Sequence, residues 1–273
     1  MVKDHRGGID LPGRSEVDQF VFQLAAGDGK LIHCPHSELY PHRDKTGLIL
    51  AAPTLPGVKQ ESVSPFFATL KAANPLPMTE LEFTTVFELL AAVLLSAQAT
   101  DVGVNKATRK LFPVAGTPRA ILELGVEALE GHIKTIGLYR MKAKHLVETC
   151  RILVEQHGGV VPRSRAALES LPGVGRKTAN VVLNVAFGEE TVAVDTHIFR
   201  VGNRTGLAPG KDPYEVEMGL MKRVPKEYLS DAHHWLILHG RYVCVARTPR
   251  CWECAVIQHC DYQPKTPPPG ASR

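Results

Sequence analysis

Four of the six cysteines lie between residues 244 and 260, with the spacing Cys244-x6-Cys251-x2-Cys254-x5-Cys260. The N-terminus lacks the charged start and apolar run of a secretion signal, so we expect reduced thiols that bind metal rather than form disulfides. Zinc accepts four thiolates, but zinc loops usually pair two short-spaced cysteine motifs, and only one is present here. The irregular spacing favours an iron–sulfur cluster, with zinc as the alternative.

The segment LPGVG at residues 171–175 is a second candidate site, because we expect it to turn the chain between two helices. Glycine adopts backbone angles closed to other residues and lets another backbone come close. Free amides at the positive N-terminus of the next helix suit a phosphate, and such contacts hold a DNA duplex without reading its sequence. An ordinary helix–turn–helix connection would have the same pattern. The candidate DNA-contacting residues are Leu171, Gly173, Val174 and Gly175.

Two charged residues, Lys177 and Asp195, stand at expected helix starts. A helix N-terminus and the neighbouring Arg176 charge both disfavour the protonated form of Lys177, and a lysine must lose its proton to act as a nucleophile. Aspartate is a favoured N-cap residue, and one carboxylate can cap a helix while it also faces a pocket. Position alone also fits a solvated lysine and a plain helix cap.

The elements that must position these residues are predicted to be helices, because no alternating strand pattern of useful length occurs. Residues 140–157, for example, place one apolar face along a helix, and Cys150 lies on that face. Residues 192–194 are apolar but too few to start a sheet. The predicted helices span 87–99, 140–157, 163–170, 176–187, 195–204, 213–223 and 226–242.

Length and composition are those of a globular protein of about two domains, with 273 residues, 44% hydrophobic and 22% charged. Residues 1–64 are interrupted by prolines and glycines and have a net charge of −1, so the +4 of the whole chain leaves +5 on the rest. We expect residues 1–64 to be a flexible extension. Its acidic residues argue against a targeting peptide, and no apolar run is long enough to cross a bilayer. The expected location is cytoplasmic, on the nucleoid.

Several segments share the pattern of one family: LPGVGRKTAN at 171–180, VDTHIFR at 194–200, LLSAQATD at 94–101, IGLY at 136–139, HHWLILHGR at 233–241, and the cysteine loop. From about residue 67 to about residue 262 the chain resembles the helix-hairpin-helix DNA glycosylase superfamily, and bacterial endonuclease III within it. The resemblance implies an all-α fold of two helical domains: a six-helix barrel with the hairpin at 79–189, and an iron–sulfur cluster domain at 65–78 and 190–264. The N-terminal extension at 1–64 and a C-terminal tail at 265–273 would flank them.

The resemblance also implies roles for single residues. Lys177 would be the nucleophile that forms a Schiff base, and Asp195 the catalytic aspartate that stabilises positive charge on the sugar and helps to deprotonate Lys177. Gln98 would fill the gap left by an extruded nucleotide, and Leu138 would press against the opposite strand; a polar helix-end residue and a core leucine are the alternatives. The remaining candidate pocket residues, which local capping or packing would also explain, are Asp101 and His197.

The cysteine spacing matches the [4Fe-4S] loop of this family, with all four cysteines as ligands. We expect the cluster to stiffen a loop that binds DNA. Arg247 and Arg250 lie between the first two ligands, where they would meet phosphates. Thr248 stands where related proteins often have a lysine, so one phosphate contact would be missing.

The predicted function is a bifunctional DNA N-glycosylase/AP lyase of base excision repair, acting as a monomer on double-stranded DNA with oxidised pyrimidines or abasic sites. An adenine-type glycosylase of the same superfamily is one alternative, but its glutamate is absent because residues 89–98 hold no carboxylate. A non-catalytic iron–sulfur protein that binds DNA or senses redox state is another. That alternative requires Lys177 or Asp195 to be absent or masked, and both are present.

Overall fold

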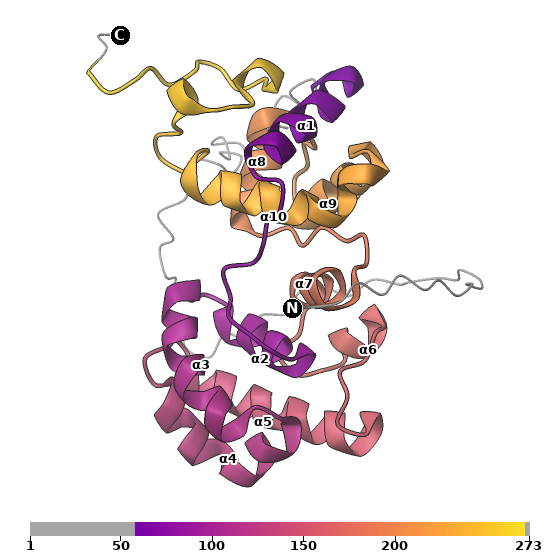
Figure 1. The fold of residues 1–273 in the computed structure, drawn as a ribbon, viewed down its shortest axis with the longest axis vertical. Helices are drawn as coiled ribbons and strands as arrows, with labels where there is room; N and C mark the ends of the chain where they lie inside the picture. The colour runs from indigo at the N-terminus through magenta and orange to yellow at the C-terminus, as the bar shows by residue number, and fades with distance from the viewer. Residues whose placement is uncertain (1–57, 271–273) are drawn as a thin grey trace, which may run out of the picture. The chain divides into compact units, whose positions relative to one another are not determined.

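The computed structural model describes residues 58–270. Within this range the regular secondary structure consists of α-helices and 3₁₀ helices, with no β-strand (Figure 1). The all-α prediction is confirmed, while residues 1–57 of the predicted extension lie outside the described residues. The α-helices are α1 (Val63–Ala73), α2 (Val86–Ser96), α3 (Asp101–Ala115), α4 (Pro118–Ile133), α5 (Tyr139–His157), α6 (Arg165–Glu169), α7 (Arg176–Phe187), α8 (Thr196–Thr205), α9 (Pro213–Arg223) and α10 (Lys226–Tyr242). The 3₁₀ helices are η2 (Gln60–Ser62), η3 (Cys251–Glu253) and η4 (Ile257–His259).

Helix boundaries differ from the sequence-based prediction mainly in the first half of the chain. The helix predicted at 87–99 ends at Ser96, because Ala97 leaves the helical region with φ −55° and ψ 119°. The sequence-based prediction contains neither α3 nor α4. Pro113 lies inside α3, and α4 is interrupted at Gly125, where φ is 77° and ψ is 167°, so neither segment has an undisturbed helical period.

The boundary predicted after residue 64 is too late in the chain. Val58 and Val63 are 4% and 0% exposed. The Arg223 guanidinium on α9 donates hydrogen bonds to the Val58 carbonyl and, at 2.6 Å, to the Leu207 carbonyl. Residues 58–64 are therefore packed into the fold and are not part of a flexible extension.

The first hydrophobic core is built by α2 to α7 (Figure 1). At its centre is α2, whose residues from Phe87 to Leu95 are all buried. A helix that is apolar on all sides is typical of a core position, and α2 packs against α3, α5 and α7. It begins at Thr85, whose side chain accepts a hydrogen bond of 3.1 Å from the Glu88 backbone N–H.

The second core contains α1, α8, α9 and α10 together with residues of the cysteine loop. The extended segment at 192–194 joins the two cores: Val192 and Val194 pack into the second, and Ala193 packs into the first. Successive side chains of an extended chain point to opposite sides, so these three apolar residues bury one side chain in the first core and two in the second. It leads directly into Asp195.

Polar contacts also link the helices of the two cores. Arg176 on α7 donates two hydrogen bonds, of 2.9 and 2.8 Å, to the Glu217 carboxylate on α9. The Asn184 side-chain amide donates to the Ser230 carbonyl at 3.0 Å. The described helices include none that is long and apolar enough to cross a membrane.

Candidate catalytic site and nucleic-acid interface

The predicted hairpin is present as α6, a turn at 170–175, and α7. Gly173 is exposed and has φ 77°, in the left-handed region. Leu171 and Val174, however, are 2% and 4% exposed and belong to the first core. Their side chains anchor the turn, so only the backbone of these two residues is left for an outside partner.

The N-terminus of α7 is open to an acceptor from outside the chain. Its N-cap is Gly175, which has no side chain to bind the first amides. Several other helices are closed by a side-chain cap, such as Thr100 on α3 and Asp212 on α9. Unpaired amides at a positive helix end bind phosphate well, so this end is suited to an anionic ligand.

Lys177 lies in the first turn of α7 and is exposed. The neighbouring Arg176 does not act on it as a free charge, contrary to the sequence-based expectation. Its guanidinium is paired with the buried Glu217 carboxylate, which raises the pKa of Arg176, and lies 4.9 Å from the centre of the Tyr214 ring. Arg176 is therefore not a free cation beside Lys177, whereas the positive helix N-terminus remains next to it.

Asp195 is the N-cap of α8. Its Oδ1 accepts hydrogen bonds from the His197 and Ile198 backbone N–H groups at 2.9 and 2.8 Å. Its second oxygen makes no hydrogen bond with any residue between 58 and 270. The residue thus caps a helix and keeps one carboxylate oxygen for another partner.

Hydrogen bonds hold the segment before Asp195 against the helix that bears Lys177. The Thr191 hydroxyl donates to the Asn180 carbonyl at 2.7 Å, and the Asn180 side-chain amide lies 3.4 Å from the Val192 carbonyl. Asn180 is one helical turn after Lys177, on the same side of α7. The segment that ends at Asp195 is in this way held against α7, the helix that bears Lys177.

His233 on α10 is a buried histidine that feels the Lys177 charge and was not singled out from the sequence. It is 4% exposed, and burial lowers its pKa to about 3, with the adjacent His234 and Lys177 charges adding to the effect. It is therefore a neutral imidazole at neutral pH. The signal that could have revealed it is the HHW segment within the family pattern.

Gln98 and Leu138 lie in two turns that approach each other. Both have left-handed backbone angles, with φ 53° and 58°. Gln98 is exposed beyond the end of α2, and Leu138 is 52% exposed at the N-cap of α5. The exposure of Leu138 excludes the alternative of a core leucine, whereas the position of Gln98, two residues after the last residue of α2, fits both a polar helix-end residue and a DNA contact.

The candidate pocket residues Asp101 and His197 are both engaged by other side chains. The Asp101 carboxylate accepts a hydrogen bond of 2.6 Å from the Arg241 guanidinium, which also binds Glu80. The His197 ring lies 3.2 Å from the Arg200 guanidinium. Asp101 therefore joins α3 to α10 through an ion pair, which places it at the contact between the cores rather than free in a pocket.

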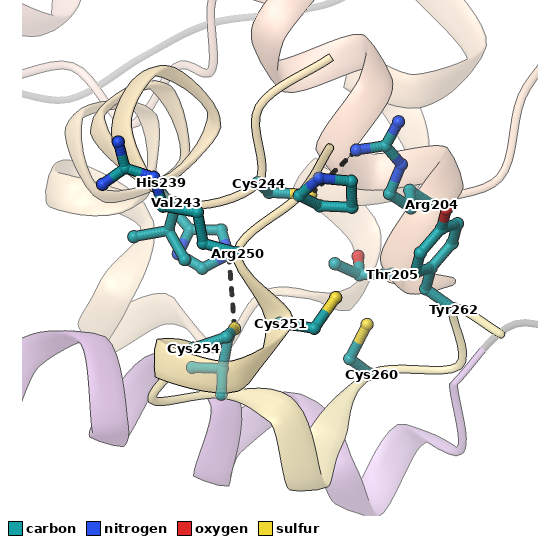
Figure 2. A pocket seen from close by; sticks show the side chains of 12 residues that line it. Arg204, Thr205, His239, Val243, Cys244, Arg250, Cys251, Cys254, Cys260 and Tyr262 are labelled. Carbon is teal, nitrogen blue, oxygen red and sulfur yellow. Dashed lines mark hydrogen bonds between the residues drawn. The ribbon is translucent and has the colours of Figure 1, made fainter. Parts of the chain in front are cut away.

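The four cysteines of the C-terminal loop line one small cavity (Figure 2). All four are free thiols, and burial raises the pKa of the Cys254 thiol to about 11. No three ligands in residues 58–270 converge closely enough to chelate a single ion. Four cysteine sulfurs around one cavity are a donor set that either an iron–sulfur cluster or a zinc ion accepts.

Two basic side chains reach cysteine sulfurs at this cavity (Figure 2). The Arg204 guanidinium lies 3.6 Å from Cys244 Sγ and donates to the Val245 carbonyl at 2.8 Å. His239 Nε2 lies 3.8 Å from Cys254 Sγ. Sequence reasoning missed both: Arg204 lies on α8, 40 residues before Cys244, and His239 lies on α10, 15 residues before Cys254.

Arg247 and Arg250 are both exposed on the cysteine loop. Arg250 forms an ion pair of 3.2 Å with Glu253 in η3, whereas Arg247 makes no ion pair within the described residues. The two arginines are therefore not equivalent toward an anionic partner.

The structure combines an all-helical fold, a glycine-containing hairpin and an exposed lysine at an uncapped helix N-terminus, and comparisons with known proteins identify its class. Residues 91–226 match the HhH-GPD superfamily of base excision DNA repair proteins. The chain belongs to this superfamily and, within it, to the endonuclease III family. It is 66% identical to endonuclease III of Escherichia coli strain K12 over 196 residues, which are 72% of this chain and 93% of that protein. Endonuclease III of Haemophilus influenzae is 62% identical over 196 residues, again 72% of this chain and 93% of that protein.

Solved structures give the same result. A trapped endonuclease III–DNA covalent intermediate matches with a TM-score of 0.71 and 44% identity, covering 75% of this chain and 96% of that one. A thermostable thymine-DNA glycosylase matches with a TM-score of 0.67 and 27% identity, covering 74% and 96%. The expectation of a base excision repair DNA glycosylase/AP lyase is confirmed.

Proposed function

We propose that this protein removes oxidised pyrimidines from double-stranded DNA and cleaves the strand at the resulting abasic sites, with Lys177 as nucleophile and Asp195 as its partner. One observation carries the proposal: the exposed Lys177 stands in the first turn of an uncapped helix that is hydrogen-bonded to the segment ending at Asp195. The relative trapped as a covalent intermediate with DNA supports nucleophilic chemistry at such a site.

The chemistry follows from these two groups. The neutral Lys177 amine attacks C1′ of the damaged nucleotide, the bond between C1′ and the base breaks, and the base leaves with a proton. The Asp195 carboxylate stabilises the positive charge that develops on the sugar and accepts a proton from the lysine. The nitrogen lone pair then breaks the C1′–O4′ bond, O4′ takes up a proton and remains on C4′ as a hydroxyl, and a Schiff base forms at C1′. Loss of a proton from C2′ and departure of the 3′ phosphate from C3′ complete the β-elimination.

A damaged base inside the stack cannot be reached, so the nucleotide must leave the helix at a cost of a few kcal/mol. Gln98 and Leu138 are placed to lower that cost, because both project from adjacent exposed turns. We assign Gln98 to the gap left by the nucleotide and Leu138 to the opposite strand. The hairpin amides at Gly173 and Gly175 hold a phosphate without reading sequence.

The residues around the cysteine cavity fit a [4Fe-4S] cluster. Cys244, Cys251, Cys254 and Cys260 would hold it, and when bound it would act as a structural centre that fixes the loop. Burial raises the pKa of the Cys244 and Cys254 thiols, and metal binding must displace the protons of its thiol ligands. Arg247 then presents a free cation to the DNA backbone.

The two hydrophobic cores correspond to two domains in this proposal: the barrel with the hairpin at 79–189, and a cluster domain made of 190–264 and the segment before 79, which now begins at residue 58. Asp195 directly follows the segment shared by both cores. The protein would act on the nucleoid as a monomer.

Borohydride trapping on a panel of duplexes tests the proposal. Duplexes with an oxidised pyrimidine, an unpaired adenine, an abasic site or no damage are incubated with the full chain and borohydride. A covalent complex with the oxidised pyrimidine and the abasic duplex, but not with intact DNA, is expected. Release of adenine without trapping would instead support the adenine-type alternative.

A further inference from the structure

His145 on α5 lies against the turn of the hairpin. A Cβ built on Gly173 would be 2.9 Å from His145 Nδ1 and 3.3 Å from its Cβ, so the imidazole packs directly on the backbone of the turn. Gly173 also has φ 77°, and a side chain there would meet both the strained backbone angle and the ring. The contact between the imidazole and the turn is therefore built into the fold.

The same face of α5 connects this contact to Leu138, the residue expected to press against the opposite DNA strand. Leu138, Met141, His145 and Thr149 follow one another at spacings of three or four residues, which places them on one side of a helix. Leu138 and Met141 are 52% and 49% exposed, and the Thr149 hydroxyl donates to the Pro172 carbonyl at 3.0 Å. This face runs from Leu138 to the hairpin, and His145 lies between the two.

The ring of His145 is partly exposed, and neither of its nitrogens makes a hydrogen bond within residues 58–270. Beside it are the free amides at the N-terminus of α7, where Gly175 supplies no side-chain cap. We propose that His145 is a further phosphate ligand at the hairpin, so that part of the DNA affinity of this protein depends on protonation of this side chain. The proposal rests on the proposed function, because it assumes that the hairpin holds DNA.

The surroundings make protonation responsive to DNA. Glu148 is paired with Arg151 at 2.9 Å, and Arg176 with Glu217 at 2.8 Å, so these acids are already engaged. A bound phosphate favours the charged form of an imidazole, so DNA binding and proton uptake would be coupled at this side chain. Besides His145, the charged groups and histidines of α5 are Arg140, Lys142, Lys144, Glu148, Arg151, Glu155 and His157. Those of the neighbouring helices are Arg119, Glu123, Glu127, Glu130 and His132 on α4, Glu88 on α2, Arg165 and Glu169 on α6, and Arg176 and Lys177 on α7.

The test is the dissociation constant of the full chain for a duplex that contains a stable abasic-site analogue, measured at pH 6.0 and pH 8.5 over a range of salt. The wild type is expected to bind about tenfold more tightly at the lower pH, the order of one charge-assisted hydrogen bond. Its salt slope should also be steeper there by about 0.9. His145→Gln and His145→Phe should match the wild type at pH 8.5 and lack the gain at pH 6.0.

His157→Phe is the matched control, because His157 is a partly exposed histidine at the other end of the same helix. It should keep the full pH dependence, and the thermal unfolding of all variants shows that each is folded. Variants that keep the gain at pH 6.0, or that lose affinity equally at both pH values, would overturn the inference. Strand cleavage of a natural abasic duplex by the wild type is measured alongside: absence of cleavage overturns the proposed function, whereas cleavage with an unaltered pH dependence in the variants overturns this inference alone.

Discussion

Gln98 and Leu138 are the two non-glycine residues in positions 58–270 with positive φ, and their turns touch. A Cβ built on Gly137, next to Leu138, would lie 3.7 Å from the Gln98 carbonyl oxygen. Left-handed backbone costs an ordinary residue about 1–2 kcal/mol, and such strain gathers at functional sites. Both residues are also exposed, so burial of their side chains does not account for the left-handed backbone.

Replacement of Leu138 by glycine separates strain from function. Leu138→Gly removes the Cβ that resists the left-handed angle, so the free energy of unfolding should stay within about 1 kcal/mol of the wild type or rise. Excision from a duplex should fall roughly tenfold or more, because the wedge that opposes restacking is lost. Urea denaturation and single-turnover excision measure the two effects. A large loss of stability with normal excision would mean that Leu138 is a packing residue.

Substitutions of Lys177 and of Asp195 should impair different steps of the reaction. Lys177→Gln should abolish both base release and strand cleavage while lesion binding is retained, because the amide keeps much of the side-chain size. Asp195→Asn should slow base removal severely but leave weak borohydride trapping on a pre-formed abasic site, where the sugar aldehyde reacts without departure of a base. Single-turnover assays on a damaged-base duplex and an abasic duplex distinguish them. Trapping by Lys177→Gln would show that another amine is the nucleophile.

The metal content of anaerobically purified protein should be about four irons per chain, with a brown colour. Arg204→Met should lower the iron content or speed its loss during dialysis, because the guanidinium donates to the loop carbonyl of Val245 and lies beside Cys244 Sγ. Arg140→Met, an exposed arginine on α5, is the control. Stoichiometric zinc without iron would contradict the cluster assignment.

The two loop arginines should differ in their effect on DNA binding. Arg247→Ala should weaken binding to all sequences and reduce the salt slope by about 0.9, the effect of one lost phosphate contact. Arg250→Ala should have a smaller effect, because its guanidinium is already paired with Glu253 and a surface pair must be broken first. Fluorescence anisotropy at several salt concentrations measures both. Equal slopes in the wild type and Arg247→Ala would mean that this residue faces away from DNA.

The N-terminal boundary can be tested with two truncated chains. A chain that begins at residue 65 loses the buried Val58 and Val63, and each buried valine contributes about 1.5–3 kcal/mol. It should therefore be less stable by several kcal/mol than a chain that begins at residue 58. Comparison of their urea midpoints measures the difference. Equal stability would mean that the N-terminal extension ends at residue 64, as the sequence alone predicts.

The sequence by itself determined the all-α class, the positions of the hairpin and of α7, α9 and α10, and the residues that could do chemistry. These depend on local information: helical spacing, glycines in a turn, and a cysteine spacing that leaves few alternatives. The family pattern added Gln98 and Leu138, whose exposure the structure then showed. Where Pro113 and Gly125 interrupt the helical period, local information was insufficient and α3 and α4 were not resolved.

Only the tertiary structure decided which groups meet. The pairing of Arg176 with Glu217 removed a charge that the sequence placed beside Lys177, and the Asp101–Arg241 pair moved a candidate pocket residue into a link between helices. The closeness of His145 to Gly173 has no trace in either local segment. Such contacts join residues far apart in the chain, and their energies depend on burial and distance, which are properties of the packed structure and not of any one segment.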